Sequence, residues 1–243
     1  IHDVCLPQLP VVLAVDRAGL VGEDGPTHHG VFDLSYLRMI PNLKVMAPKD
    51  SRELSKMLEL AFALDGCVAI RYPRGPVHDE ILRQLGAADY QPIELGKAEV
   101  LSQGSDITIV AIGAMVAVAL EVAMALRARG LDVGVINARF IKPLDEETLL
   151  NVAEKTDYLI TLEENVLAGG FGSAVLELLE AQGLLHQVKV KRIGVPDVFV
   201  EHGDNGSLYR ALGLDVGQLV ERILLTTGQR KEMYTYGKVR EHS

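Results

Sequence analysis

One glycine-rich stretch of this sequence gathers most of the side chains that could do chemistry. Residues 17–30 contain four glycines, a proline, two carboxylates and two adjacent histidines, and they follow the apolar residues 11–15. Glycine lets the backbone turn sharply and approach a ligand closely, and histidine exchanges protons near neutral pH. His28 is therefore our candidate proton-transfer group, and Asp24 could orient it or couple to its charge. For His29, packing or a backbone hydrogen bond is an equally good interpretation.

Two arginines stand where predicted buried strands end. Arg17 stands at the end of a strand predicted at residues 11–17, and Arg74 follows one predicted at residues 67–72. Ligands of open parallel sheets bind beyond the carboxyl ends of the strands. If these strands are neighbours, the two guanidinium groups converge, and two planar forks suit a phosphate dianion. The alternative is an arginine–carboxylate pair at the sheet edge, and for Arg71 a structural ion pair is the preferred interpretation.

Two further polar clusters lie in predicted loops. Residues 163–173 join a strand to a helix and are rich in glutamate and glycine. A helix N-terminus there could receive an anion, but the spacing is not the dinucleotide fingerprint, so tight helix–strand packing or a subunit contact is favoured. Residues 201–204 contain His202 without a second ligand at a spacing that suits a metal. We expect a structural or interface role for them.

The composition excludes several classes of function. The chain has 243 residues, 48% of them hydrophobic, which predicts one or two domains with a packed core. Its net charge of −9, without a basic run before the last fifteen residues, argues against a nucleic-acid partner. No apolar window is long enough to predict a membrane span. Cys5 and Cys67 form no metal or redox motif and are expected to be buried free thiols.

The hydrophobic pattern predicts an α/β fold with two doubly wound sheets. In the first half, Asp50 and Glu53 form a capping box, and the helix that follows should bury a stripe ending in Phe62. Strands are predicted at residues 11–17, 43–48, 67–72, 97–101, 106–112, 133–137, 158–163 and 188–193. Helices are predicted at residues 33–40, 50–65, 79–85, 115–129, 146–155, 172–182, 206–212 and 215–226. The order of strands and helices indicates parallel sheets with helical cover.

Two strings of this sequence resemble the thiamine-diphosphate enzymes related to transketolase, and among them the 1-deoxy-D-xylulose-5-phosphate synthases. The first string extends from Asp16 to Arg38 and contains Gly22-Glu23-Asp24-Gly25-Pro26-Thr27-His28-His29. The second string is Arg71-Tyr72-Pro73-Arg74-Gly75. The resemblance implies the C-terminal half of a pyrimidine-binding domain at residues 1–80, a linker at 81–96, a transketolase C-terminal-like domain at 97–226 and a tail at 227–243. It also implies scaffold roles for residues 36–38 and for the Tyr72–Pro73 pair, which would aim Arg74.

The resemblance implies a decarboxylative condensation of pyruvate with glyceraldehyde 3-phosphate, a step of isoprenoid precursor and thiamine biosynthesis. Arg17 and Arg74 match the arginines that hold the substrate phosphate, and His28 and Asp24 match the family's catalytic pair. No residue here matches the sites for thiamine diphosphate or Mg²⁺, which are expected mainly on an N-terminal fragment of the same enzyme. That fragment and a homodimer partner are the expected partners, in the bacterial cytoplasm or, in a plant, the plastid.

Three alternatives stay open at this point. The chain could be part of a transketolase or a β subunit of an oxoacid dehydrogenase, which also lacks the diphosphate domain. It could also be a non-catalytic module when it is isolated. The first residues resemble the last turns of a helix stopped before Pro7, so we expect the chain to be a fragment.

Overall fold

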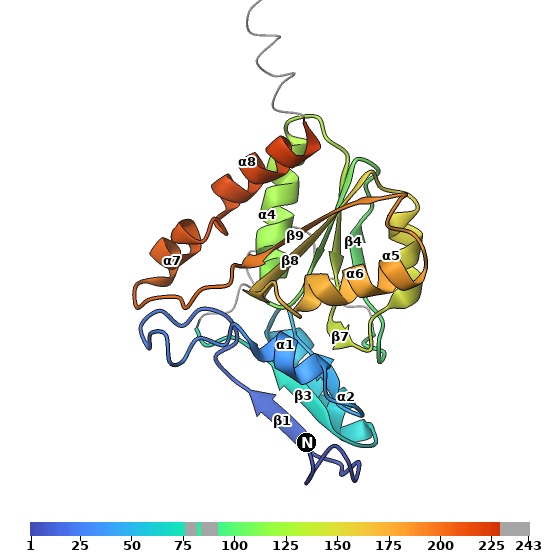
Figure 1. The fold of residues 1–243 in the computed structure, drawn as a ribbon, viewed down its shortest axis with the longest axis vertical. Helices are drawn as coiled ribbons and strands as arrows, with labels where there is room; N and C mark the ends of the chain where they lie inside the picture. Colours follow the sequence, from blue (N-terminus) through green and yellow to red (C-terminus); the bar gives the residue numbers. More distant parts are fainter. Residues whose placement is uncertain (76–81, 84–91, 229–243) are drawn as a thin grey trace, which may run out of the picture.

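The structure, a computed structural model, describes residues 1–75, 82–83 and 92–228. It has two α/β units, each built on a mostly parallel sheet (Figure 1). The elements in chain order are β1 (Val12–Val15), α1 (Asp33–Arg38), β2 (Lys44–Met46), α2 (Ser51–Ala63), β3 (Val68–Arg71), β4 (Glu99–Ser102), β5 (Ile107–Ala111), α4 (Met115–Arg127), β6 (Val133–Asn137), β7 (Phe140–Lys142), α5 (Glu146–Ala153), β8 (Tyr158–Val166), α6 (Phe171–Ala181), β9 (Lys189–Val195), α7 (Asn205–Ala211) and α8 (Val216–Thr227). The predicted α/β class is confirmed.

The first sheet has the strand order β1-β3-β2-β7. Its first three strands are parallel, as the strand–loop–strand–helix–strand order predicts. The central strand, β3, is buried along its whole length. The fourth strand, β7, comes from the second half of the chain and pairs antiparallel with β2. The sequence pattern did not predict this strand, which ties the two units together.

Two predictions about burial are wrong. The strand predicted as buried at residues 11–17 is β1, an edge strand within the described chain that exposes Leu13 and Ala14. Phe62, predicted to lie in the buried stripe of α2, is 78% exposed, whereas Met57 and Ala61 are buried. Apolar residues are buried only where another element covers them, and within the described residues β1 has a strand neighbour on one side alone.

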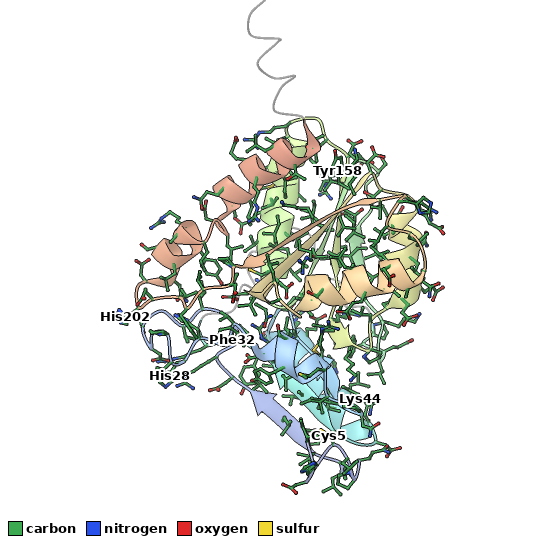
Figure 2. The ribbon with its side chains drawn as sticks, in the orientation of Figure 1. Cys5, His28, Phe32, Lys44, Tyr158 and His202 are labelled. Atoms are coloured by element: carbon green, nitrogen blue, oxygen red, sulfur yellow. The ribbon has the colours of Figure 1, made fainter. Side chains whose placement is uncertain are left out.

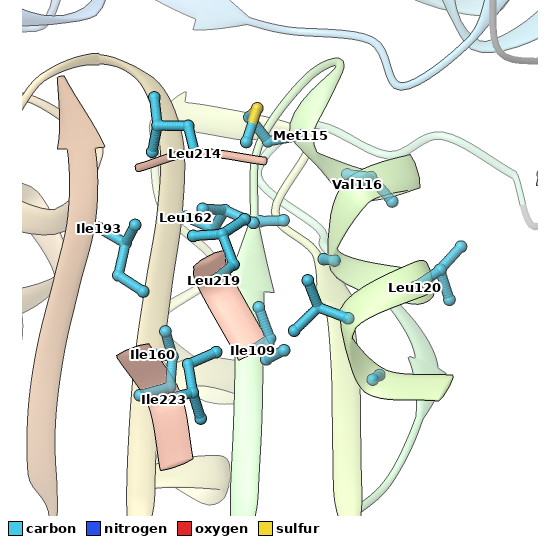
Figure 3. Packing of buried hydrophobic residues seen from close by; sticks show 14 of the residues in the cluster. Ile109, Met115, Val116, Leu120, Ile160, Leu162, Ile193, Leu214, Leu219 and Ile223 are labelled. Carbon is cyan, nitrogen blue, oxygen red and sulfur yellow. The ribbon is translucent and has the colours of Figure 1, made fainter. Parts of the chain in front are cut away.

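The second sheet has the order β4-β6-β5-β8-β9, with β4 antiparallel and the other strands parallel. Alternate residues of its central strand face opposite helical layers. Ile109 packs in one core with α4 and α8, and Val110 packs in another with α5 and α6. Figure 3 shows part of the first of these cores, with Ile109 on β5, Leu120 on α4 and Ile223 on α8. The predicted doubly wound sheet is confirmed, although β8 continues past residue 163 to Val166.

A buried cluster of charged side chains joins the two units. Lys49 Nζ lies 2.9 Å from Glu99 and 3.5 Å from Glu53, and Arg139 Nε lies 2.7 Å from Glu53. Asn137 donates to the carboxylates of both Glu53 and Glu99. All five side chains are at most 3% exposed. Because charges buried without partners are costly, the two units are fixed against each other as long as this cluster is complete.

Several smaller predictions can also be compared with the structure. Residues 1–9 form hydrogen-bonded turns rather than a helix, with Leu6 N donating to Ile1 O. Cys5 and Cys67 are buried free thiols, and burial together with contact with Cys5 raises the pKa of the Cys67 thiol to about 11.

The helix predicted at residues 79–85 lies outside the described residues except for the helical residues 82 and 83, and so does the tail from residue 229. Among the described helices, none has the length and hydropathy to cross a membrane.

Candidate functional site

The pairing of β1 with β3 brings the two predicted arginines to one edge of the first sheet. The hydrogen bonds continue past the strand ends, since Tyr72 N donates to Val15 O and Ala18 N donates to Tyr72 O, both at 3.0 Å. Arg17 and Arg74 therefore leave the sheet side by side. The Tyr72 backbone helps to set the position from which Arg74 extends, in line with the scaffold role expected for the Tyr72–Pro73 pair.

Arg17 and Arg74 both reach one oxygen of Asp24. Arg17 Nε lies 3.1 Å from Asp24 Oδ2, and Arg74 donates to the same oxygen. These hydrogen bonds, first from Arg74 and then from Arg17, lower the pKa of the Asp24 carboxyl. The convergence of the arginines and the arginine–carboxylate pair, which the sequence left as alternatives, thus occur together. Arg17 has a φ of +58°, a left-handed conformation that few non-glycine residues adopt.

A cavity of about 310 Å³ opens beside this arrangement. Its wall combines the glycine-rich loop, the segment after β3 and the start of α7. The lining residues are Val21, Gly22, Glu23, Asp24, Arg74, Gly75, Asp204 and Asn205. Half of the Arg74 side chain is exposed to solvent, so a small anion can reach its guanidinium group.

The expected contact between Asp24 and His28 is not among the hydrogen bonds of the described residues. Asp24 faces the two arginines, whose charges attract it, and His28 Nδ1 lies 2.9 Å from Thr27 Oγ1. His28 is exposed on the loop, on the same side of the molecule as His202 and Phe32 (Figure 2). The imidazole is thus accessible, but Asp24 does not orient it.

His29 has the structural role that was one of its two interpretations. The residue is 8% exposed, and its Nδ1 accepts a hydrogen bond from Val21 N at 3.0 Å. An accepting Nδ1 leaves the proton on Nε2, which lies 3.3 Å from Glu201 O. His29 thereby connects the loop to residues 201–204, which pack against it as expected.

The loop is closed at its base by glycines. Gly19 and Gly30 exchange two backbone hydrogen bonds of 2.9 Å. Gly19 has a φ of +75°, and a Cβ at this position would stand 1.9 Å from the Glu164 carboxyl carbon. A side chain here would collide with a buried carboxylate, so the chain needs glycine at this turn.

Glu164 and Tyr209 are functional candidates that sequence reasoning missed. The buried Glu164 carboxylate accepts from Leu20 N at 2.6 Å and from the Tyr209 hydroxyl. Burial raises the pKa of Glu164 and of Tyr209. Arg71 donates to the carbonyl oxygens of Gly30 and Glu164 and to the Asp33 carboxylate, so its predicted structural ion pair is present.

The glycine-rich turn at residues 163–173 packs as predicted. Glu163 accepts from the backbone N–H groups of Phe171 and Gly172, at 2.7 and 2.8 Å. The N-terminus of α6 therefore already holds a carboxyl group from its own chain. A Cβ on Gly172 would lie 2.5 Å from Thr161 Oγ1, so helix and strand are in close contact.

The described residues can be compared with the ligand sets that hold metal ions. They contain no group of three or more His, Cys, Asp or Glu side chains placed to hold a metal ion. Of the acidic side chains that line the cavity, Asp24 is engaged with two arginines and Asp204 with a backbone amide. What the described residues do place at this cavity is a pair of arginines that share one carboxylate.

Comparisons with known proteins find related families and relatives over most of the chain. The family "Transketolase, pyrimidine binding domain" matches residues 1–78, and "Transketolase, C-terminal domain" matches residues 96–219. A 1-deoxy-D-xylulose-5-phosphate synthase of Desulforudis audaxviator is 54% identical over 90% of this chain and 34% of its own length. The 1-deoxy-D-xylulose-5-phosphate synthase 1 of Geobacter sulfurreducens is also 54% identical, over 88% of this chain and 33% of its own length. The chain thus spans about one third of the length of these relatives.

A solved structure extends the comparison to three dimensions. A chain described as a split gene transketolase, in an inactive β4 tetramer, superposes with a TM-score of 0.78 at 34% identity, covering 90% of this chain and 68% of that one. The assignment follows from both family matches, from the likeness to this solved structure and from the two sheets. The chain belongs to the transketolase family and contains sequence of its pyrimidine-binding and C-terminal domains.

Proposed function

We propose that this chain supplies the acceptor-substrate side of a 1-deoxy-D-xylulose-5-phosphate synthase, which condenses pyruvate with glyceraldehyde 3-phosphate and releases carbon dioxide. The observation that carries the proposal is the meeting of Arg17 and Arg74 on one carboxylate oxygen beside an open cavity. Two guanidinium groups that converge on one anion suit a phosphate dianion. Relatives that bear the synthase name at 54% identity support this reaction within the family.

Each site residue has a defined role in this proposal. Arg17 and Arg74 bind the phosphate, and Asp24 holds the two guanidinium groups in their convergent orientation. His28, exposed on the loop, exchanges a proton with a substrate hydroxyl. When bound, thiamine diphosphate supplies the carbon–carbon bond chemistry, and Mg²⁺ accompanies its diphosphate.

The proposal also defines partners and a location. An N-terminal polypeptide would carry most of the cofactor and metal ligands, because the chain spans only about one third of its relatives' length. A second copy of the assembly would complete a homodimer. The product would serve isoprenoid precursor and thiamine biosynthesis, and the bacterial sources of the relatives favour the cytoplasm.

The test is to combine this chain with an N-terminal polypeptide of a relative and to measure the deoxy sugar formed from the two substrates. Arg74→Ala should raise the KM for glyceraldehyde 3-phosphate at least about tenfold, because it removes charge-assisted hydrogen bonds. The KM for pyruvate should change less than about twofold. The matched control is Arg129→Ala, which removes an exposed arginine just after α4 that donates to Ala125 O. Equal rises in both KM values would contradict the assignment.

The transketolase alternative is favoured by one observation, the likeness at 34% identity to a split gene transketolase. Product analysis separates it, because a transketolase would transfer a two-carbon unit from a ketose phosphate without decarboxylation. An oxoacid dehydrogenase β subunit would need an acyl acceptor in place of the sugar phosphate. A complex that binds the sugar phosphate but makes no product would favour the non-catalytic module.

A further inference from the structure

The loop that carries Asp24 and His28 is held by side chains of the second α/β unit. We propose that Asn205 and Glu164 are positioning residues that set the affinity of this loop for the acceptor phosphate. The inference deepens the proposed function and rests on it. Both residues act through the backbone of the loop, at Leu20 and Gly22.

Asn205 contacts the loop with both ends of its amide. Its Oδ1 accepts from Gly22 N at 2.8 Å, and its Nδ2 donates to Leu20 O at 3.1 Å. A carboxylate could make only the first of these bonds, because it has no donor. Asn205 is the first residue of α7, whose cap, Asp204, accepts from Ser207 N at 2.9 Å. The amide is thus anchored to a helix that starts beside the loop.

Glu164 binds the other backbone polar group of Leu20, its N–H. Its carboxylate accepts from Leu20 N at 2.6 Å and from the hydroxyl of Tyr209, on the helix that begins with Asn205. Leu20 therefore has both backbone polar groups bound by side chains from β8 and α7. Close packing adds to this, since a Cβ on Gly22 would lie 1.9 Å from Gly203 O.

The position of this clamp explains why it should affect phosphate binding. Asp24 follows Gly22 by two residues in the chain, and its carboxylate bridges the two arginines. Asn205 also lines the cavity beside Arg74. If Gly22 moves, Asp24 moves with it, and the two guanidinium groups lose their common orientation. Small displacements of positioning groups weaken a preorganised anion site.

Hydrogen exchange on the intact chain tests the clamp directly. In Asn205→Ala the amide of Gly22 should exchange about tenfold faster than in the wild type, because it loses its acceptor. Asn151→Ala is the matched control, since Asn151 is exposed on α5, away from the loop. An unchanged exchange rate at Gly22 in Asn205→Ala would overturn the proposal.

Kinetics of the reconstituted enzyme test the consequence. Asn205→Ala should raise the KM for glyceraldehyde 3-phosphate about 5–20-fold while the pyruvate KM and kcat stay within about twofold. Glu164→Gln keeps an acceptor for Leu20 N, so its KM for glyceraldehyde 3-phosphate should stay within about threefold of the wild-type value. In Glu164→Ala this KM should rise as it does in Asn205→Ala. Equal changes for both substrates, or a fall in kcat alone, would overturn the positioning role. A wild-type complex without synthase activity would count against the proposed function only, since the exchange result does not depend on it.

Discussion

At the residue scale, the conformation of the loop depends on the absence of a side chain at Gly19. In Gly19→Ala the new Cβ would meet Glu164 at 1.9 Å in a left-handed backbone conformation. We expect a loss of about 3 kcal/mol in the free energy of unfolding, about 1 from the conformation and the rest from a displaced carboxylate that leaves Leu20 N without its acceptor. Urea denaturation measures this loss.

Gly183→Ala is the control for this change. Gly183 has a φ of +70°, and no atom lies within 4 Å of an added Cβ. Gly183→Ala should therefore lower the free energy of unfolding by only about 1 kcal/mol, from the left-handed backbone conformation alone. If the two variants are equally destabilised, the contact between Gly19 and Glu164 does not constrain the loop.

Residue types alone predicted which side chains would gather at the site, but not how they pair. Arg17 and Arg74 could be chosen because both follow strands, and the parallel sheet brings them together. Asn205 and Glu164 could not be chosen, because their partners lie 183–185 and 144 positions away in the chain. A single asparagine in a polar segment gives no signal until the fold places it against a backbone.

At the element scale, the N-terminus of α6 is sensitive to pH. Burial raises the pKa of Glu163 from 4.5 to about 7, against the opposing effect of the N–H groups of Gly172 and Phe171. The folded state therefore binds a proton that the unfolded state has already released between these pH values. Stability from this group is complete below about pH 4.5 and is lost as the pH rises through 7.

Glu163→Gln removes this titration. The stability of the wild type relative to the variant should fall by an amount on the order of 3 kcal/mol between pH 4.5 and pH 7.5. Denaturation at a series of pH values gives the difference directly. A constant difference over this range would mean that Glu163 stays ionised in the folded protein, held by the two backbone amides.

The elements that the sequence predicted well are long and periodic, and those that it missed are short or lie at an edge. The helix α4 and the strand β5 are predominantly apolar, so their hydrophobic pattern was enough to predict them. β7 has only three residues, too few to show a period. The exposure of β1 depends on which elements cover it, and a strand's own sequence does not contain that information.

At the scale of the whole molecule, the two units share more than a linker. Phe140, on β7, belongs by chain order to the second unit, yet it is fully buried against Met46, Met57 and Ile70 of the first. The charged cluster around Glu53 and Arg139 crosses the same boundary. Neither unit can open without exposing apolar surface or separating buried charges, so both should unfold in one transition.

Phe140→Ala tests this coupling. Loss of a buried aromatic side chain costs about 3–5 kcal/mol, and cooperative units should share that loss. The amides of β3 and β5 should therefore lose equal protection against hydrogen exchange. The control is Leu225→Ala, at an exposed position, which should change the free energy of opening of neither strand by more than about 0.5 kcal/mol. If β3 becomes labile while β5 stays protected, the units are independent. The loop would then be held by a domain that moves separately from the sheet carrying Arg17 and Arg74.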